Sequence, residues 1–286
     1  MTREMIMNEL KNRGYEVQST DVVKNGVLFQ GIIIGNGNLR PTVYVDSYLD
    51  RNDLNKVVAE IEDAYDRSLV ESPTFSADNL LDWNYVKTHL QLCLQRKGNE
   101  DIVKRDFLDL EQYVRVIVNS NENGAASFKV KPDYLIHFGI SESELFDAAM
   151  ESMKQDIVVE DMLDILKQTM PEMDFIQLEA MSHGVPSQII ITNKHKLNGA
   201  VSICDMETLS KIAEKHDADL AIIPSSIHEC ILLPVDDETN FIELDAMIKE
   251  VNATEVAPEE VLSDYAYRFI RDEKRISYIS PLRRQN

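Results

Sequence analysis

Polar and reactive side chains gather between two apolar segments in the last third of the chain. The run Ile223-Pro-Ser-Ser-Ile-His-Glu-Cys230 places two hydroxyls, an imidazole, a carboxylate and a thiol between predicted strands. A second polar run, from Asn193 to Asn198, precedes Gly199 in the same predicted sheet. Loops held by a rigid sheet often carry functional residues, so we expect the two runs to share one polar pocket. Its candidate residues are Asn193, His195, Asn198, Ser225, Ser226, His228 and Glu229.

Two interpretations of this pocket stay open. Ser225 or Ser226 could act as a nucleophile with His228 as its base, and Glu229 could orient the imidazole, as in a hydrolase. Residues so close in sequence rarely reach the required in-line geometry. Pro-Ser-Ser is also typical of a turn whose hydroxyls bond to their own backbone. We therefore assign no catalytic residue.

The sequence has none of the common cofactor or metal signatures. Walker A, G-x-S-x-G, H-E-x-x-H and EF-hand patterns are all absent. His89 and Cys93 stand four residues apart on a predicted helix and could share a metal, but no second pair lies near them in the sequence. We expect neither a cofactor nor a metal, with Cys93 as a buried residue.

The chain is strongly acidic, with 50 Asp and Glu against 29 Lys and Arg and a net charge of −21. Residues 141–174 hold ten acidic residues against two lysines, and residues 236–264 hold ten against one. Such a field repels phosphate backbones, which argues against direct nucleic-acid binding. The leading hypothesis is a non-enzymatic binding protein with a basic protein as partner. The alternatives are the hydrolase and an acidic mimic of nucleic acid. The simplest interpretation of the charge itself is solvated helix faces.

Cysteine usage and hydropathy predict a cytoplasmic location. Cys93, Cys204 and Cys230 are far apart and form no C-x-x-C pair, which fits a reducing compartment. Residues 1–14 mix charged with apolar side chains, unlike a signal peptide. No apolar run approaches the ~20 residues of a membrane-spanning helix, so we expect no membrane association. The oligomeric state is not indicated.

Turn and periodicity signals predict the elements that hold these residues. Asn-Gly pairs predict hairpin turns at Asn25-Gly26, Asn123-Gly124 and Asn198-Gly199. Apolar periodicity predicts helices over 1–14, 51–69, 80–95, 141–153, 161–170, 206–216, 241–252 and 259–267. Alternation predicts strands over 15–23, 27–34, 42–45, 113–118, 126–130, 189–192, 200–203, 220–223 and 229–233.

These elements predict an α+β fold of antiparallel, hairpin-based sheets packed with helices in two lobes. A strict βαβ alternation is missing, so a doubly wound nucleotide-binding sheet is not expected. The expected segments are 1–72, with an N-terminal helix, a hairpin and a helix; 73–175, mostly helical with one hairpin; and 176–286, a C-terminal α+β lobe.

Several motifs resemble one known family. They are Ile191-Thr-Asn-Lys-His-Lys-Leu-Asn-Gly-Ala200, Ile223 to Glu229, Glu250-Val-Asn-Ala-Thr-Glu-Val256, Glu260 to Asp264, Asp82 to Val86, Phe107 to Leu110 and His137 to Ser141. Together they are similar to the domain-of-unknown-function family numbered 5688, known from anaerobic gut bacteria, over roughly residues 25 to 270. The resemblance implies a bacterial cytoplasmic protein and carries over no reaction, ligand or catalytic residue.

Overall fold

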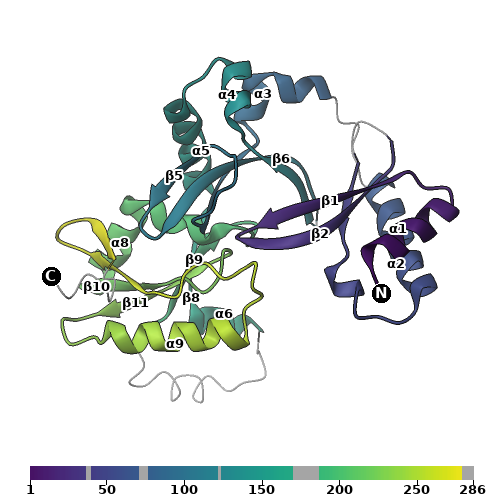
Figure 1. The fold of residues 1–286 in the computed structure, drawn as a ribbon. Helices are drawn as coiled ribbons and strands as arrows, with labels where there is room; N and C mark the ends of the chain where they lie inside the picture. The colour runs from purple at the N-terminus through teal and green to yellow at the C-terminus, as the bar shows by residue number, and fades with distance from the viewer. Residues whose placement is uncertain (37–39, 71–76, 122–123, 170–186, 279–286) are drawn as a thin grey trace. The chain divides into compact units, whose positions relative to one another are not determined.

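A computed structural model describes residues 1–36, 40–70, 77–121, 124–169 and 187–278 of the 286-residue chain (Figure 1). The fold is α+β, with helices and three antiparallel sheets, as the sequence predicts. The chain divides into two compact units, Met1–Val86 with Ile117–Ser127, and Lys87–Val116 with Phe128–Asn286. Among the described residues, no helix has the length and apolar character needed to cross a membrane.

The first unit is built on a three-stranded sheet packed against two helices. Its strands lie in the order β1 (Val17–Lys24), β2 (Val27–Ile34) and β3 (Thr42–Tyr44). The Asn25-Gly26 turn is confirmed, because both residues have the positive φ of a type I′ turn, 48° and 81°. The core is formed by one face of the sheet with α1 (Arg3–Asn12) and α2 (Leu54–Val70). Short 3-10 turns follow at η1 (Asp46–Tyr48) and η2 (Ala77–Leu81).

A four-stranded sheet is centred on β6 (Leu110–Asn121). β4 (Leu90–Arg96) and β5 (Lys104–Phe107) flank β6, and β7 (Gly124–Lys129) also pairs with it. This pairing agrees with the predicted hairpin, although Asn123 itself lies outside the described residues.

The helix predicted over 80–95 is wrong. After the end of η2, only α3 (Trp83–Lys87) is helical there, and the chain then enters β4. Leu and Gln favour helices in isolation, but the neighbours Leu92, Cys93 and Leu94 are all buried, so both faces of this strand are covered. That packing outweighs helix propensity. His89 and Cys93 therefore do not share a helix face.

A six-stranded sheet forms the larger part of the second unit. Its order is β13 (Arg275–Tyr278), β12 (Tyr267–Ile270), β10 (Asp219–Ile223), β11 (Cys230–Val235), β9 (Ile189–Asn193) and β8 (Ile157–Asp161). Every neighbouring pair is antiparallel. α9 (Phe241–Thr254) packs on one face of this sheet, over Ala221 and Ile223. The remaining helices are α4 (Pro132–Phe138), α5 (Glu142–Asp156), α6 (Met162–Thr169) and α8 (Met206–His216).

Two predicted elements near the candidate pocket are wrong. The segment after Asn198 is not a strand but the 3-10 helix η3 (Gly199–Cys204), whose six residues are all buried. Asn198 adopts a left-handed conformation, φ 54°, as the residue that begins this helix rather than as part of a hairpin turn. The helix predicted over 259–267 is also wrong. Tyr267 and Phe269 are fully buried in β12, and this alternation favours a strand.

Candidate functional site

The topology of the six-stranded sheet brings the two polar runs together. β9 and β10 both run antiparallel to β11, so the end of β9 and the β10–β11 connection lie at the same end of the sheet. The backbone N–H of Asn198 donates to Nδ1 of His228 at 3.1 Å, and Ala200 N–H donates to the Ile227 carbonyl at 3.2 Å. The loops that carry the predicted residues are therefore in direct contact.

Gly199 allows this close approach. A Cβ atom at this position would lie 2.3 Å from Thr192 Oγ1, 2.6 Å from Asn193 N and 2.7 Å from the His228 carbonyl oxygen. Thr192 Oγ1 donates to that same carbonyl at 2.8 Å. Only glycine fits between these backbone atoms without displacing them.

Asn193 organises its own loop rather than an open pocket. Its buried side chain accepts N–H bonds from His195, at 3.1 Å, and Leu197, at 3.3 Å, and donates to the Leu197 carbonyl at 2.8 Å. His195 is exposed, and within the described chain its ring makes no hydrogen bond or ion pair. The structure therefore joins Asn198 and His228 and does not bring His195 into contact with them.

The geometry does not favour a serine nucleophile. Ser226 Oγ accepts the His228 backbone N–H at 3.0 Å, and Ser226 N–H donates to the Glu229 carbonyl at 3.3 Å, which is the self-bonded turn that Pro-Ser-Ser suggests. Because Nδ1 of His228 accepts an N–H, the neutral ring carries its proton on Nε2 and has no lone pair left for a hydroxyl. Among the described residues, neither Ser225 nor Ser226 bonds to the ring.

Glu260 is the partner of His228 that sequence reasoning missed. Its Oε1 lies 3.4 Å from His228 Nε2, and its carbonyl accepts Ile227 N–H at 2.8 Å. Glu260 belongs to one of the motifs that resemble the family, and this motif was the one indication in the sequence that Glu260 matters. The helix wrongly predicted over 259–267 gave no reason to place Glu260 beside His228.

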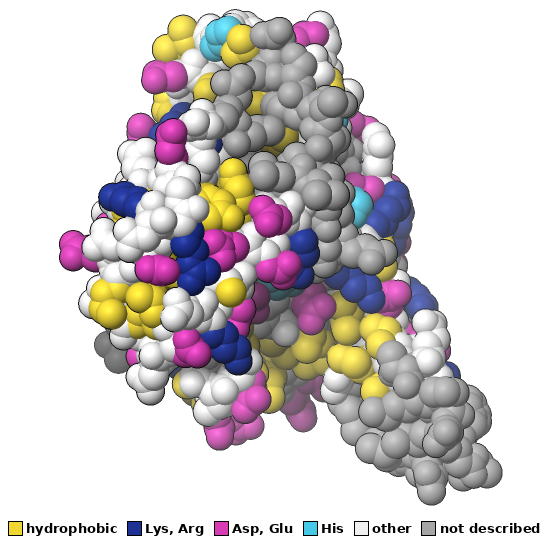
Figure 2. Space-filling view, turned by 90° about the vertical axis from the view of Figure 1, so that its right-hand side faces the viewer, with side chains coloured by type: hydrophobic (Ala, Val, Ile, Leu, Met, Phe, Trp, Pro, Cys, Tyr) yellow, Lys and Arg dark blue, Asp and Glu magenta, His cyan; other side chains and the backbone are white. Residues whose placement is uncertain are grey.

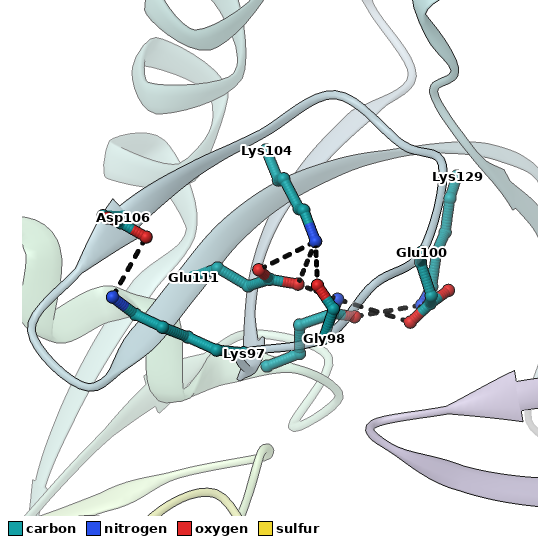
Figure 3. A network of polar contacts seen from close by, with 8 residues as sticks. Lys97, Gly98, Glu100, Lys104, Asp106, Glu111 and Lys129 are labelled. Carbon is teal, nitrogen blue, oxygen red and sulfur yellow. Dashed lines mark hydrogen bonds and ion pairs between the residues drawn. The ribbon is translucent and has the colours of Figure 1, made fainter.

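A second polar cluster, also missed, lies on the four-stranded sheet (Figure 3). Lys129 Nζ donates to Glu100 at 2.6 and 2.8 Å and to Gln95 Oε1 at 2.9 Å. Gln95 Nε2 donates to Glu111 at 2.7 Å, and Lys104 lies 3.1 Å from the same carboxylate. Two lysines thus balance two glutamates, and the buried amide of Gln95 links the two pairs. The cluster ties the β4–β5 connection to the sheet and leaves no uncompensated charge for a ligand.

The three cysteine thiols are buried and protonated. Burial raises the pKa of Cys93 to about 11 and that of Cys204 to about 12, and it also raises the pKa of Cys230. Thiols in this state are poor nucleophiles and poor metal ligands. Within the described ranges, no three His, Cys, Asp or Glu side chains are grouped to hold a metal.

The outer surface of α9 carries carboxylates without cations beside them. Glu243, Glu250 and Glu255 are exposed, and in the part of the chain that the structure describes none of them forms an ion pair. The nearby cations are engaged elsewhere: Lys249 Nζ lies 4.7 Å from the centre of the Tyr265 ring, and Arg268 is paired with two aspartates.

The same helix exposes three large apolar side chains, Ile242 (58%), Met247 (46%) and Val251 (44%). Figure 2 shows one face of the molecule, on which acidic and basic side chains are interspersed. The unpaired carboxylates and exposed apolar side chains of α9, with Asp236, Glu238 and Asp264 near its ends, are called the α9 surface below.

Comparison with known proteins identifies a family whose function is unknown. The model of DUF5688, a family of unknown function, matches residues 1–271 of the 286-residue chain. No curated protein and no solved structure matches the chain. The family match covers both compact units, and the chain therefore belongs to the DUF5688 family of unknown function.

Proposed function

We propose that this protein is a non-enzymatic binding protein that takes a basic polypeptide on its α9 surface. The observation that carries the proposal is the row of exposed carboxylates, without ion pairs among the described residues, beside exposed apolar side chains along α9 and its C-terminal cap. Complementary charge steers a partner and fixes its orientation, while buried apolar contacts supply most of the lasting affinity.

The spacing on α9 suits an elongated cationic segment. Glu243 and Glu250 are seven residues apart, which places them about 10 Å apart along one side of the helix at 1.5 Å per residue. Met247 and Val251 are one turn apart on a neighbouring stripe. A partner with Lys or Arg beside apolar side chains would match both stripes.

The two alternatives have less support. The hydrolase requires a lone pair on His228 that the Asn198 N–H already occupies. A nucleic-acid mimic requires carboxylates spaced like phosphates, and it would bind a nucleic-acid-binding protein in competition with DNA. Competition with DNA for a nucleic-acid-binding protein would identify a mimic, and we do not propose this as a second function.

A cytoplasmic location in a bacterium is part of the proposal. It is supported by the family resemblance and by three cysteines that are all free and buried, which suits a reducing compartment.

A matched pair of triple variants tests the α9 surface. The test variant is Glu243→Gln, Glu250→Gln and Glu255→Gln. The control is Glu142→Gln, Asp147→Asn and Glu151→Gln on α5, which removes the same charge from other exposed carboxylates. The probe is a fluorescent peptide of lysine and leucine at helical spacing, and Kd is measured by anisotropy across a salt series.

We expect the α9 variant to bind roughly tenfold more weakly, since three exposed charge contacts at about 0.5 kcal/mol each sum to that factor. The α5 control should bind within about twofold of the original protein. Equal weakening by both variants would show that the peptide responds to net charge and not to the α9 surface, which would contradict the proposal. Absence of peptide binding by the unmodified protein would also contradict it.

A further inference from the structure

His228 links three segments of the chain through every polar group it has. Its Nδ1 accepts the Asn198 N–H, its own N–H donates to Ser226 Oγ, and its carbonyl accepts Thr192 Oγ1. Its Nε2 lies 3.4 Å from Glu260 Oε1. The side chain of His228 is 23% exposed, so the ring can exchange protons with water.

We propose that His228 is a pH-sensitive lock between the loop of residues 193–199 and the loop of residues 224–229. The uncharged ring holds the loops together through Nδ1, and the protonated ring releases them. This device does not depend on the α9 surface.

The release follows from the donor inventory of imidazole. A charged ring carries a hydrogen on both nitrogens and accepts no hydrogen bond. Nδ1–H would then face the Asn198 N–H across a contact that measures 3.1 Å in the uncharged state. Asn198 is 96% buried, so its N–H must find another acceptor, and an unsatisfied buried donor is unfavourable. The contact is therefore lost whenever the ring is protonated.

Several ionisable groups lie around the ring. Glu260 Oε1 is 3.4 Å from Nε2, and Glu229 is the next residue along the chain. In the neighbouring loop, Lys194 and Lys196 are held by ion pairs to Asp156, at 3.0 Å, and Glu160, at 3.6 Å. His195, exposed in that loop, is the remaining ionisable side chain. Asn198 and Thr192, which contact His228 directly, carry no charge.

Nuclear magnetic resonance of the intact, ¹⁵N-labelled protein tests the lock. At about pH 8 the His228 ring should be the Nε2–H tautomer, and Asn198 should show slow amide exchange. On titration to about pH 5, the ring signals and the Asn198 amide shift should change with one midpoint, and Asn198 protection should fall roughly tenfold or more.

Three variants separate the lock from general effects of acid. His195→Gln should leave both transitions unchanged. Glu260→Gln, which removes the carboxylate beside Nε2, should leave the two transitions coincident at one midpoint. His228→Gln should abolish the pH response of Asn198, and if that variant does not fold, the unmodified protein and Glu260→Gln still decide.

Several results would overturn the lock. They are an Nδ1–H tautomer at neutral pH, a ring that stays uncharged until the protein unfolds, and an Asn198 amide that does not respond while the ring titrates. Separation of the two midpoints in Glu260→Gln would equally refute it.

Discussion

At Gly199 the chain has no room for a side chain, and this makes a sharp test of the loop contact. We expect Gly199→Ala to lower the free energy of unfolding by about 1–3 kcal/mol, because the new Cβ would press on two backbone atoms within 2.7 Å. Gly98→Ala is the control, since a Cβ there meets nothing within 4 Å. Urea unfolding measures both variants. Similar midpoints for the two would show that the loops do not approach as closely as described.

The buried thiols predict selective reactivity. With the pKa of Cys93 near 11 and that of Cys204 near 12, the reactive thiolate is scarce at neutral pH, and burial also blocks access. A disulfide reagent at about pH 8 should modify the native protein only over hours, and all three cysteines should react promptly in denaturant. Fast modification of even one thiol in the native protein would place that cysteine nearer the surface.

The β5–β6 hairpin shows how one side chain can secure an element. Its turn holds Leu108 at φ 57°, a conformation that costs a branched residue about 1 kcal/mol or more. The next residue, Asp109, accepts hydrogen bonds from Ser263 Oγ at 2.8 Å and Tyr267 Oη at 2.7 Å. The strained turn is thus offset by bonds to buried partners.

Removing Asp109 should therefore loosen the hairpin. We expect Asp109→Ala to cost about 2–4 kcal/mol, because it removes the carboxylate that accepts hydrogen bonds from Ser263 and from the fully buried Tyr267. In the same hairpin, Asp106 is 83% exposed and, within the part of the chain that the structure describes, pairs only with Lys97, so Asp106→Ala should change stability by less than about 0.5 kcal/mol. Thermal unfolding of the two variants decides, and equal losses would contradict the role of Asp109.

The capping box at the start of α5 predicts a pH dependence. Hydrogen bonds from the Ser141 N–H and hydroxyl lower the pKa of Glu144 below its usual value. A carboxyl whose folded pKa is depressed stabilises the folded state above its unfolded pKa, and this contribution is lost as pH falls through the folded pKa. Stability should therefore decline in acid more steeply for the original protein than for Glu144→Gln, as measured by thermal melts below about pH 5. Parallel pH profiles would argue against the box.

At the scale of the elements, local sequence patterns predicted helices and turns better than they predicted the contacts between distant residues. The capping box of α5, the periodicity of α8 and the Asn25-Gly26 turn are encoded within a few residues, and each is confirmed. β4, η3 and β12 were missed because long-range burial decides them. The contact between Asn198 and His228 follows from adjacent predicted strands. The contacts His228–Glu260 and Lys129–Glu100 each join residues about 30 positions apart in the sequence. No local sequence pattern predicts contacts over such a distance.

For the molecule as a whole, a net charge of −21 predicts a response to salt. Repulsion among surplus carboxylates opposes the compact state and is screened as the Debye length falls from about 30 Å at 0.01 M to about 8 Å at 0.15 M. The ion pairs are mostly exposed and worth little each, so their screening is the smaller effect. We expect Tm to rise with sodium chloride, and to rise less in the α9 triple variant. A falling Tm would show that local ion pairs dominate.

The discontinuous first unit has a consequence for synthesis on the ribosome. The buried residues of its main hydrophobic cluster lie between Ile6 and Ile61, yet the unit also includes residues 117–127. At translation rates of 5–20 residues per second, the last residue of the returning segment is synthesised roughly 2–8 s after residue 86. During that interval the nascent chain can bury the hydrophobic cluster between Ile6 and Ile61, although the first unit still lacks residues 117–127. The nascent chain therefore completes the first unit only after residues 87–116 of the second unit have been synthesised.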